Sequence, residues 1–436
     1  MTGPRHPAPA SFGAFVARAA SDGRLVVQPR MGMADPADMR AGLRAVRQAG
    51  VCATGTITLD SFTRVGDHAA ARAALAAGDD LNGYPIVAYA PRVTREVLDG
   101  VHDPSFPVQV RHGSARPQDI FAKLGACGLH ATEGGPLSYC LPYSRVPVAE
   151  AVRAWTESCR VLAEQRAYGR EPHLESFGGC MLGQLCPPSL LVAISILEGV
   201  FFRRHGLRSV SLSYAQQTHP DQDAEAVRAL RTLAGELLAD IDWHVVLYSY
   251  MGVFPRTPGG ATALLEEAAR LAVRTGTERL IVKTVVEAHR IPDIAENVAA
   301  LRVASAAAGR TPAATARPDA ADTGILAEAR ALVEAVLDLD ADLGTALVRA
   351  VERGYLDIPY CLHPDNVGRT RAHVDATGRL CWSQTGAMPL GAAVRGKDED
   401  TTAEHLLRSL TYVERAFDDA ALERTMTASQ RRCNSR

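Results

Sequence analysis

The sequence predicts an α/β fold in the form of a (β/α)8 barrel. Between residues 24 and 306, short runs rich in β-branched residues alternate with amphipathic segments of helical length, which is the pattern of βα units around a parallel sheet. These runs recur about every 30 residues, as the strands of a closed barrel do. No G-x-G-x-x-G motif follows the first run, which disfavours an open dinucleotide-binding sheet.

Nine runs qualify as strands, one more than a closed barrel of this kind needs. We therefore expect eight of them to form the barrel and one to be an extra or misread element. The candidate strands begin near Leu25, Ala53, Pro85, Val108, Leu129, Leu174, Val210, Val245 and Leu280.

Three further segments flank the predicted barrel, which takes residues 24–306. Residues 1–23 are expected to form an N-terminal extension, and residues 307–323, which lack large apolar side chains, a linker or exposed loop. Residues 324–436 are expected to form a small C-terminal α+β appendage packed on the barrel. Its predicted elements are helices at 326–337 and 343–353, a hairpin in AHVDATGRLCWS and a final helix near 402–417.

The composition argues against partners such as nucleic acid or a membrane. The 436 residues carry a net charge of −2, and 47% of them are hydrophobic and 22% charged, which is too balanced for attraction to a polyanion. The longest apolar run, 190–202, contains Glu198 and is shorter than the ~20 residues of a membrane span, so it predicts a core helix. Nine cysteines without C-x-x-C spacing, and a start without an apolar leader, predict a reduced, cytoplasmic protein.

Arginines stand at or near the ends of several candidate strands. Arg30, Arg64 and Arg111 follow the strands that begin near residues 25, 53 and 108, and His112 comes next after Arg111. In a barrel of this kind these ends share the face that carries the chemistry. Each arginine could instead cap or pair locally. Together, three guanidinium groups could hold the two carboxylates of a dicarboxylic acid through bidentate hydrogen bonds.

A carboxylate and two phenols follow the next candidate strand. Glu133 precedes a double glycine, and Tyr139 and Tyr143 come after it at a four-residue interval. Glu133 could be the counter-ion of the arginines, receive a substrate ammonium or act as a base. Three arginines with one glutamate would suit an acidic amino acid.

Lys283 is one of only three lysines among 47 basic residues, and it stands at the end of an apolar strand with Glu287 four residues later. It could form a Schiff base, bind an anionic or hydroxylated cofactor group, or pair with Glu287. No H-E-x-x-H, C-x-x-C or G-x-S-x-G motif is present, so the sequence predicts no metal site in this chain and no hydrolase nucleophile. His363, in the turn LHPDN, is interpreted as a structural hydrogen-bonding residue.

Several long motifs, taken in order, carry a resemblance to a known family. QPRMGM, VQVRHG, EGGPLSYCLPYSR, FGGCMLGQLCPPS, YMGVFP and VKTVVEAHRIP resemble, in order and spacing, motifs of the large (epsilon) subunit of glutamate mutase, also called methylaspartate mutase. The likeness runs from about residue 24 to 300, with a further patch at PYCLHPDNVG. It implies a TIM barrel and an isomerase that interconverts L-glutamate and (2S,3S)-3-methylaspartate by a radical rearrangement dependent on adenosylcobalamin.

The resemblance also implies roles for individual residues. Glu133 would be catalytic and would receive the substrate amino group. The substrate would be bound by Arg30, Arg64, Arg111, His112, Glu133, Tyr139 and Tyr143. The cofactor would be bound by Gly32, Pro142, Met251, Phe254, Lys283, Glu287 and Ile291.

A partner follows from a missing motif. The D-x-H-x-x-G signature, which supplies the histidine below cobalt, does not occur in the sequence. The resemblance therefore implies a separate small cobalamin-binding (sigma) subunit against the C-terminal face of the barrel, in a heterotetramer that contains a homodimer of this chain. Two other functions stay open: a metal-free lyase or aldolase using Lys283, and a non-catalytic homologue that binds an acidic amino acid.

Overall fold

Eight parallel strands surround a common core in a computed structural model that describes residues 11–181, 185–312, 322–391 and 402–434, with side chains as far as residue 427. They lie side by side in the order β1, β8, β7, β6, β5, β4, β3, β2. Their bounds are Val26–Pro29 (β1), Gly55–Thr58 (β2), Val108–Arg111 (β3), Ala131–Gly134 (β4), His173–Ser176 (β5), Ser209–Ala215 (β6), Asp242–Tyr248 (β7) and Arg279–Val282 (β8).

The barrel closes between β1 and β2. Val27 forms a parallel bridge with Ala53, and its amide donates to the carbonyl oxygen of Cys52 at 2.9 Å. In return the Thr54 amide donates to the Val27 carbonyl at 3.3 Å. The prediction of an α/β fold built on an eight-stranded parallel barrel is therefore confirmed.

Eight of the nine predicted strands are present, and the strand predicted near Pro85 is wrong. In this region only Tyr84 forms a bridge, with Leu59, and residues 85–88 form a turn. Proline has no N–H to donate to a ladder, and the bridge lies beyond the end of β2. The short apolar run that resembled a strand is therefore a buried loop at the barrel mouth.

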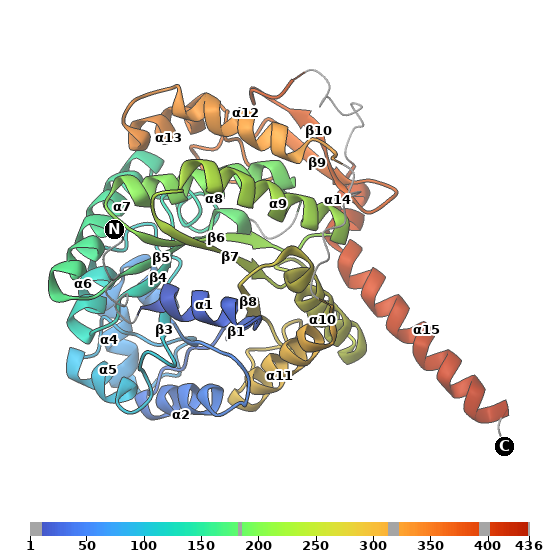
Figure 1. The fold of residues 1–436 in the computed structure, drawn as a ribbon, viewed down its shortest axis with the longest axis horizontal. Coiled ribbons are helices and arrows are strands. Elements are labelled where there is room, and N and C mark those ends of the chain that lie inside the picture. Colours follow the sequence, from blue (N-terminus) through green and yellow to red (C-terminus); the bar gives the residue numbers. More distant parts are fainter. Residues whose placement is uncertain (1–10, 182–184, 313–321, 392–401, 435–436) are drawn as a thin grey trace, which may run out of the picture.

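Helices cover the outside of the barrel (Figure 1). Their starts carry clear signals: Asp35 caps α2 with Pro36 following, and Asp293 and Glu296 form a capping box on α11. The helices of the barrel region are α2 (Pro36–Arg47), α3 (Ser61–Val65), α4 (His68–Ala77), α5 (Pro91–Leu98), α6 (Gln118–Cys127), α7 (Val148–Ala163), η1 (Glu164–Tyr168), η2 (Gly178–Cys180), α8 (Pro188–Arg204), α9 (Pro220–Leu237), α10 (Pro258–Thr275) and α11 (Ile294–Arg310).

The predicted core helix at 190–202 is part of α8, which is buried from Pro188 to Phe202. It is covered on both sides because β5 and β6 lie beneath it and α12 (Ile325–Leu337) packs on top. Within the described ranges, no helix has both the length and the apolar character needed to cross a membrane.

Helix α1 (Phe12–Ser21), within the predicted N-terminal extension, covers the N-terminal end of the barrel. Phe12 stacks on His173 at 5.0 Å between ring centroids, and the guanidinium of Arg279 lies 4.9 Å from the Phe12 ring. These two partners are the first residues of β5 and β8. The opposite, C-terminal end is therefore the one open to ligands.

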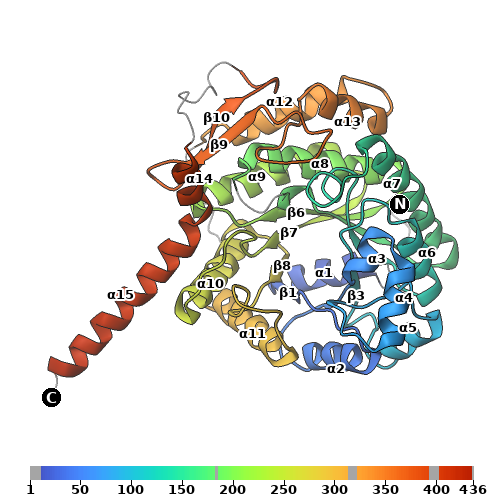
Figure 2. The same cartoon turned by 180° about the vertical axis from the view of Figure 1, so that it is seen from behind.

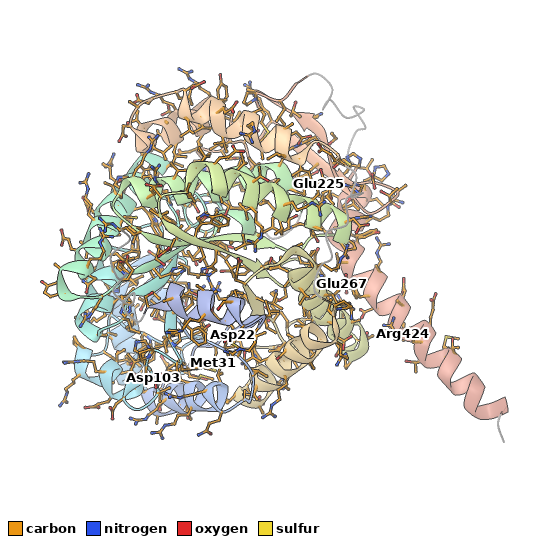
Figure 3. The ribbon with its side chains drawn as sticks, in the orientation of Figure 1. Asp22, Met31, Asp103, Glu225, Glu267 and Arg424 are labelled. Carbon is orange, nitrogen blue, oxygen red and sulfur yellow. The ribbon has the colours of Figure 1, made fainter. Side chains whose placement is uncertain are left out.

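The C-terminal appendage lies along the outer side of α8 and α9 (Figure 2). The two predicted helices and the hairpin are present, whereas the predicted final helix is two helices, the second of which runs far past residue 417. Figure 3 shows Arg424 on the part of that helix that extends away from the barrel. Of the predicted linker, α11 includes residues up to Arg310, and residues 313–321 lie outside the described ones. The elements are α12, α13 (Leu343–Glu352), β9 (Thr370–Val374), β10 (Leu380–Thr385), α14 (Ala403–Leu410) and α15 (Tyr412–Asn434).

Candidate active site

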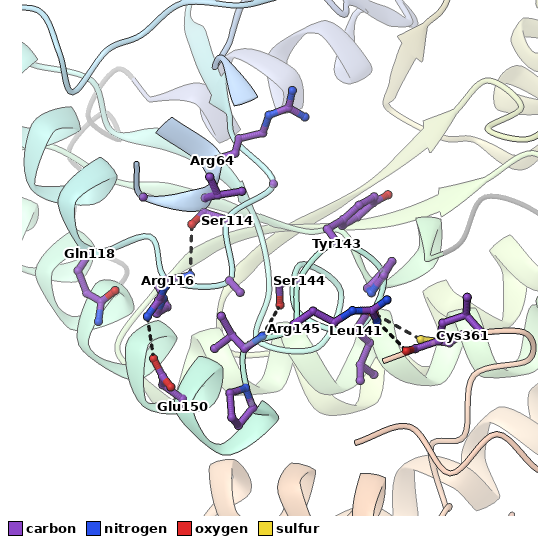
Figure 4. A pocket seen from close by; sticks show the side chains of 18 of the residues that line it. Arg64, Ser114, Arg116, Gln118, Leu141, Tyr143, Ser144, Arg145, Glu150 and Cys361 are labelled. Atoms are coloured by element: carbon purple, nitrogen blue, oxygen red, sulfur yellow. Dashed lines mark hydrogen bonds and ion pairs between the residues drawn. The ribbon is translucent and has the colours of Figure 1, made fainter. Parts of the chain in front are cut away.

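A cavity of about 1210 Å³ opens at the C-terminal ends of β2, β3 and β4 (Figure 4). Three of the residues singled out from the sequence, Arg64, Pro142 and Tyr143, line it. Its far wall comes from the appendage, through residues 360–362. Barrel and appendage thus build the cavity together.

Arg111 and Glu133 form a buried ion pair at the same end of the barrel, although neither is among the described residues that line this cavity. Arg111 is the last residue of β3, and Glu133 lies on β4. Nη2 of Arg111 is 2.9 Å from Oε2 of Glu133. The two side chains are only 5% and 1% exposed. Burial raises the pKa of Glu133, although the charge of Arg111 opposes this shift.

Two tyrosines complete what we call the Arg111 cluster: Arg111, Glu133, Tyr139 and Tyr248. The hydroxyl of Tyr139 donates to Oε1 of Glu133. The Tyr248 hydroxyl oxygen accepts from Nη1 of Arg111 at 3.0 Å and lies 2.9 Å from Oε2 of Glu133. Both carboxylate oxygens of Glu133 are thus held in place by named donors.

Tyr248, Glu175 and Arg279 were missed by the sequence reasoning. Tyr248 also contacts Glu175, which pairs with the fully buried Arg279. Arg279 further donates to Oε1 of Gln28 at 2.6 Å, so a polar network runs through the barrel interior beneath the Arg111 cluster. The only signal was a charged residue in each of the strands HLES and RLIV, which could equally have faced solvent.

His112 is placed behind Tyr139 rather than on the cavity wall. Its ring stacks on Trp155 at 5.8 Å and meets Tyr139 edge-on at 5.2 Å. Burial, with a smaller contribution from the positive charges of Arg64 and Arg111, lowers its pKa to about 3. Nδ1 accepts the Ser114 N–H at 3.0 Å, so the neutral ring carries its proton on Nε2.

A second group, which we call the Lys283 cluster, lies where β8 ends: Arg30, Phe254, Lys283 and Glu287. Nζ of Lys283 and Nη1 of Arg30 lie 3.1 Å and 3.3 Å from the same oxygen of Glu287. Nζ is also 5.3 Å from the Phe254 ring centroid. Burial lowers the pKa of Lys283 to about 8, although Glu287 opposes this, and a cavity of about 300 Å³ adjoins the cluster.

The remaining predicted residues lie around the same barrel end. Arg64 is not at a strand end as predicted, because β2 stops at Thr58 and Arg64 lies in the short helix α3. At Gly32 a Cβ atom would lie 2.1 Å from the Thr58 carbonyl oxygen, so the close approach of this loop to the end of β2 requires glycine. Met251 is partly buried after β7, and Ile291 is 69% exposed after β8.

Comparison with known proteins gives sequence matches over most of the chain. The family model described as methylaspartate mutase E chain matches residues 6–408. A glutamate mutase epsilon subunit from Escherichia coli O157:H7 is 28% identical over 409 residues, covering 90% of this chain and 84% of that protein. The corresponding protein from Halobacterium salinarum is 32% identical over 362 residues, covering 80% of this chain and 74% of its own length.

Among solved structures, a truncated 3-deoxy-D-arabino-heptulosonate 7-phosphate synthase from Thermotoga maritima covers 66% of this chain and 84% of its own, with a TM-score of 0.36 at 12% identity. The strand order, and not this weak likeness, establishes the barrel. The sequence matches, in contrast, extend over most of the chain. They show that the chain belongs to the methylaspartate mutase E chain family.

Proposed function

We propose that this chain is the epsilon subunit of a glutamate mutase, which converts L-glutamate into (2S,3S)-3-methylaspartate with adenosylcobalamin. The observation that carries the proposal is the Arg111 cluster, a guanidinium and a carboxylate held side by side at the mouth of a barrel of this family. An α-amino acid carries the complementary pair of charges. Arg64 on the cavity wall and Arg30 nearby would serve the second substrate carboxylate.

The chain's own contribution is to bind and orient the substrate. The described bonds of Arg111 to Glu133 and Tyr248 use two of its five N–H groups, which leaves donors for a substrate carboxylate. Glu133 would accept the substrate ammonium while Tyr139 keeps the carboxylate in place. Tyr143 would cover the substrate from the cavity side and help to exclude water.

The residues around the barrel mouth fit the proposed cofactor. The ammonium of Lys283 donates hydrogen bonds and the carboxylate of Glu287 accepts them, a donor set that suits the vicinal hydroxyls of a ribose. Pro142 on the large cavity, and Phe254 beside the smaller one, offer apolar surface. The cofactor, when bound, supplies the radical chemistry, and the protein supplies position and exclusion of water.

The proposed sigma subunit would bind to the C-terminal face of the barrel. Large apolar side chains are exposed there: Val65 is 66% exposed, Tyr143 51%, Ile291 69% and Leu362 83%. Apolar groups gathered around a concave site are typical of an interaction surface. The relatives' name, epsilon subunit, agrees with an enzyme of several subunits, here proposed as a heterotetramer.

The deciding experiment combines the full chain with a cobalamin-binding subunit that carries D-x-H-x-x-G, adenosylcobalamin and L-glutamate. We expect 3-methylaspartate and the electron paramagnetic resonance signal of cob(II)alamin. Absence of both, with a partner shown to bind cobalamin, would refute the proposal.

One observation favours a second candidate function. A buried lysine whose pKa is lowered to about 8 is the kind of amine that forms a Schiff base. A lyase or aldolase using Lys283 would be trapped by borohydride with an acidic amino acid or its keto acid in the absence of cobalamin. A covalent adduct on Lys283 would support that function, and its absence alongside mutase turnover would exclude it.

A further inference from the structure

The loop between β4 and α7 carries Tyr139, Pro142 and Tyr143, so its position sets the wall of the cavity. Its first half is held from within the barrel region. The buried carboxylate of Glu198 on α8 accepts the amides of Leu137 and Ser138 at 3.2 and 2.9 Å. Its second half, residues 141–147, has no regular secondary structure beyond turns.

Helix α7 lacks a cap of its own where this loop ends. Its N-cap residue is Pro147, whose side chain makes no capping bond. The amide of Val148 instead donates to Oδ2 of Asp365 at 2.7 Å, across 217 residues of sequence. A carboxylate at a helix N-terminus is stabilised by the free amides and by the helix dipole. The appendage thus supplies the cap that the loop lacks.

His363, two residues before Asp365, contacts the same stretch of the loop. Its Nε2 lies 3.0 Å from the carbonyl oxygen of Val146, and its Nδ1 lies 3.1 Å from the amide of Asp365. Because a carbonyl only accepts and an amide only donates, the ring is neutral with its proton on Nε2. One imidazole therefore joins the loop to the turn and orders the turn itself.

Two further hydrogen bonds join the loop to the turn on the cavity side, one donated by the loop and one by the turn (Figure 4). Nη1 of Arg145 donates to the Leu362 carbonyl at 2.6 Å, and Sγ of Cys361 donates to the Leu141 carbonyl at 3.3 Å. The turn is itself held by Asn366, whose side chain bonds the amide and carbonyl of Ile358 at 2.8 and 3.0 Å. The turn therefore has its own anchor within the appendage.

We infer that residues 361–365 of the appendage are a positioning element, which caps α7 and holds loop residues 141–147 so that Pro142 and Tyr143 face the cavity. The appendage is then part of the active-site wall. His363 and Asp365 are positioning residues, since they act through the loop and not on the substrate. The positioning role itself does not depend on the proposed function; only the effect expected on enzyme turnover rests on it.

Amide hydrogen exchange of the full-length chain tests the inference without any assay of activity. In Asp365→Ala and His363→Ala, we expect exchange over residues 141–148 to rise about fivefold to tenfold, with Val148 most affected in Asp365→Ala. Arg330→Ala is the matched control. Arg330, on α12, also ties the appendage to the barrel, through bonds of 2.6 and 2.8 Å to Glu236 on α9, and neither residue belongs to the β4–α7 loop or to the turn at 361–365.

Unchanged exchange over 141–148 in both variants would overturn the inference, and so would an equal rise in Arg330→Ala. If either alanine variant fails to fold, Asp365→Asn and His363→Gln replace them. Asparagine keeps a hydrogen-bond acceptor without the charge, and glutamine keeps a donor near the place of Nε2. Both should therefore still raise the amide exchange of residues 141–148, but by less than global unfolding of the chain would.

In the assembled mutase, the same variants should raise KM about fivefold to tenfold with little loss of kcat, and His363→Gln should recover part of the affinity. A fall in kcat with an unchanged KM would contradict positioning of the cavity wall. If the wild-type assembly shows no turnover, the proposed function fails, while the exchange measurement still decides the inference.

Discussion

The Arg111 cluster and the Lys283 cluster stand at the same end of one barrel and are built from the same kinds of group. They differ in how completely the protein encloses them. In the Arg111 cluster the paired side chains are 5% and 1% exposed, whereas in the Lys283 cluster only Lys283 is similarly buried, at 6%, and its partners Arg30 and Glu287 are 35% and 24% exposed. One oxygen of Glu287 serves both Arg30 and Lys283, while both oxygens of Glu133 have named partners.

This difference indicates two ways of preparing a binding site. A buried pair with satisfied hydrogen bonds keeps its geometry before a ligand arrives, because neither charge can be left without its partner. A pair that shares one oxygen at a half-open rim can rearrange at little cost. We therefore expect the Arg111 cluster to be pre-organised and the Lys283 cluster to adapt to what binds it.

The largest expected effect comes from breaking the buried pair. Arg111→Met would leave Glu133 buried without its counter-charge, which should lower the free energy of unfolding by about 3–5 kcal/mol. Arg30→Met, the matched change in the open cluster, should lower it by at most about 1 kcal/mol. Urea unfolding at pH 7 measures both. Equal costs for the two variants would remove the distinction between the clusters.

The titration of Lys283 tests the electrostatics of the open cluster. Burial lowers its pKa from 10.5 to about 8 in the folded chain, so between these values the unfolded chain binds more protons. Stability contributed by this group therefore rises with pH across that window, by about 2 kcal/mol between pH 7.5 and 10. The difference in unfolding free energy between wild type and Lys283→Met, measured in urea, should show this rise.

Parallel pH profiles for wild type and Lys283→Met would mean that Lys283 titrates near its ordinary pKa. Water around the ammonium, or the charge of Glu287, would then cancel the effect of burial on the pKa of Lys283. Lys123→Met, in which the removed lysine lies on α6 far from β8 in sequence, is the control for a general effect of losing a lysine.

The fold was largely predictable because the strands of a barrel leave a recognisable pattern in the sequence. Buried parallel strands appear as short apolar runs, and their regular spacing is visible in one sequence. The strand near Pro85 failed for a physical reason, since a buried loop and a buried strand share the same composition. The extent of α15 past residue 417 was also missed, because its polar sequence has no apolar face to detect.

Arg111, Glu133 and Lys283 were singled out because they are charged residues at the C-terminal ends of apolar runs, and the structure places all three at or next to the C-terminal ends of β3, β4 and β8. Tyr248 also ends its strand, but an uncharged tyrosine in an apolar run is not distinctive in the sequence. Tyr248 and Arg279 come from β7 and β8, whose inward and outward positions cannot be distinguished without the register. His112 shows the converse, a residue beside a site residue that turns into the core.

Arg111→Lys tests the difference between the two clusters through substrate binding. An ammonium cannot reproduce the planar fork that reaches Glu133, Tyr248 and a substrate carboxylate together, so KM for L-glutamate should rise about tenfold or more in the assembled enzyme. Arg30→Lys, whose described bond to Glu287 is a single long one of 3.3 Å, should raise KM less. A near-normal KM for Arg111→Lys would contradict the proposed clamp.

The smallest effect is expected from Glu287→Gln. Burial raises the pKa of Glu287, but Lys283 and Arg30 outweigh this and hold it below its ordinary value, so its contribution is present above pH 4.5 and lost as the pH falls through the folded-state pKa. At pH 7 the cost of Glu287→Gln should be limited to about 1 kcal/mol, because Glu287 is partly exposed and the buried Lys283, unlike an arginine, can lose its proton when its counter-charge is removed.

Removing Glu287 should also shift the Lys283 transition to lower pH, because the main charge that favours the protonated amine is gone. Unfolding free energies of Glu287→Gln and of Glu287→Gln with Lys283→Met, compared from pH 6 to 10, isolate that transition. A cost for Glu287→Gln as large as that of Arg111→Met would show that the Lys283 cluster is as closed as the Arg111 cluster.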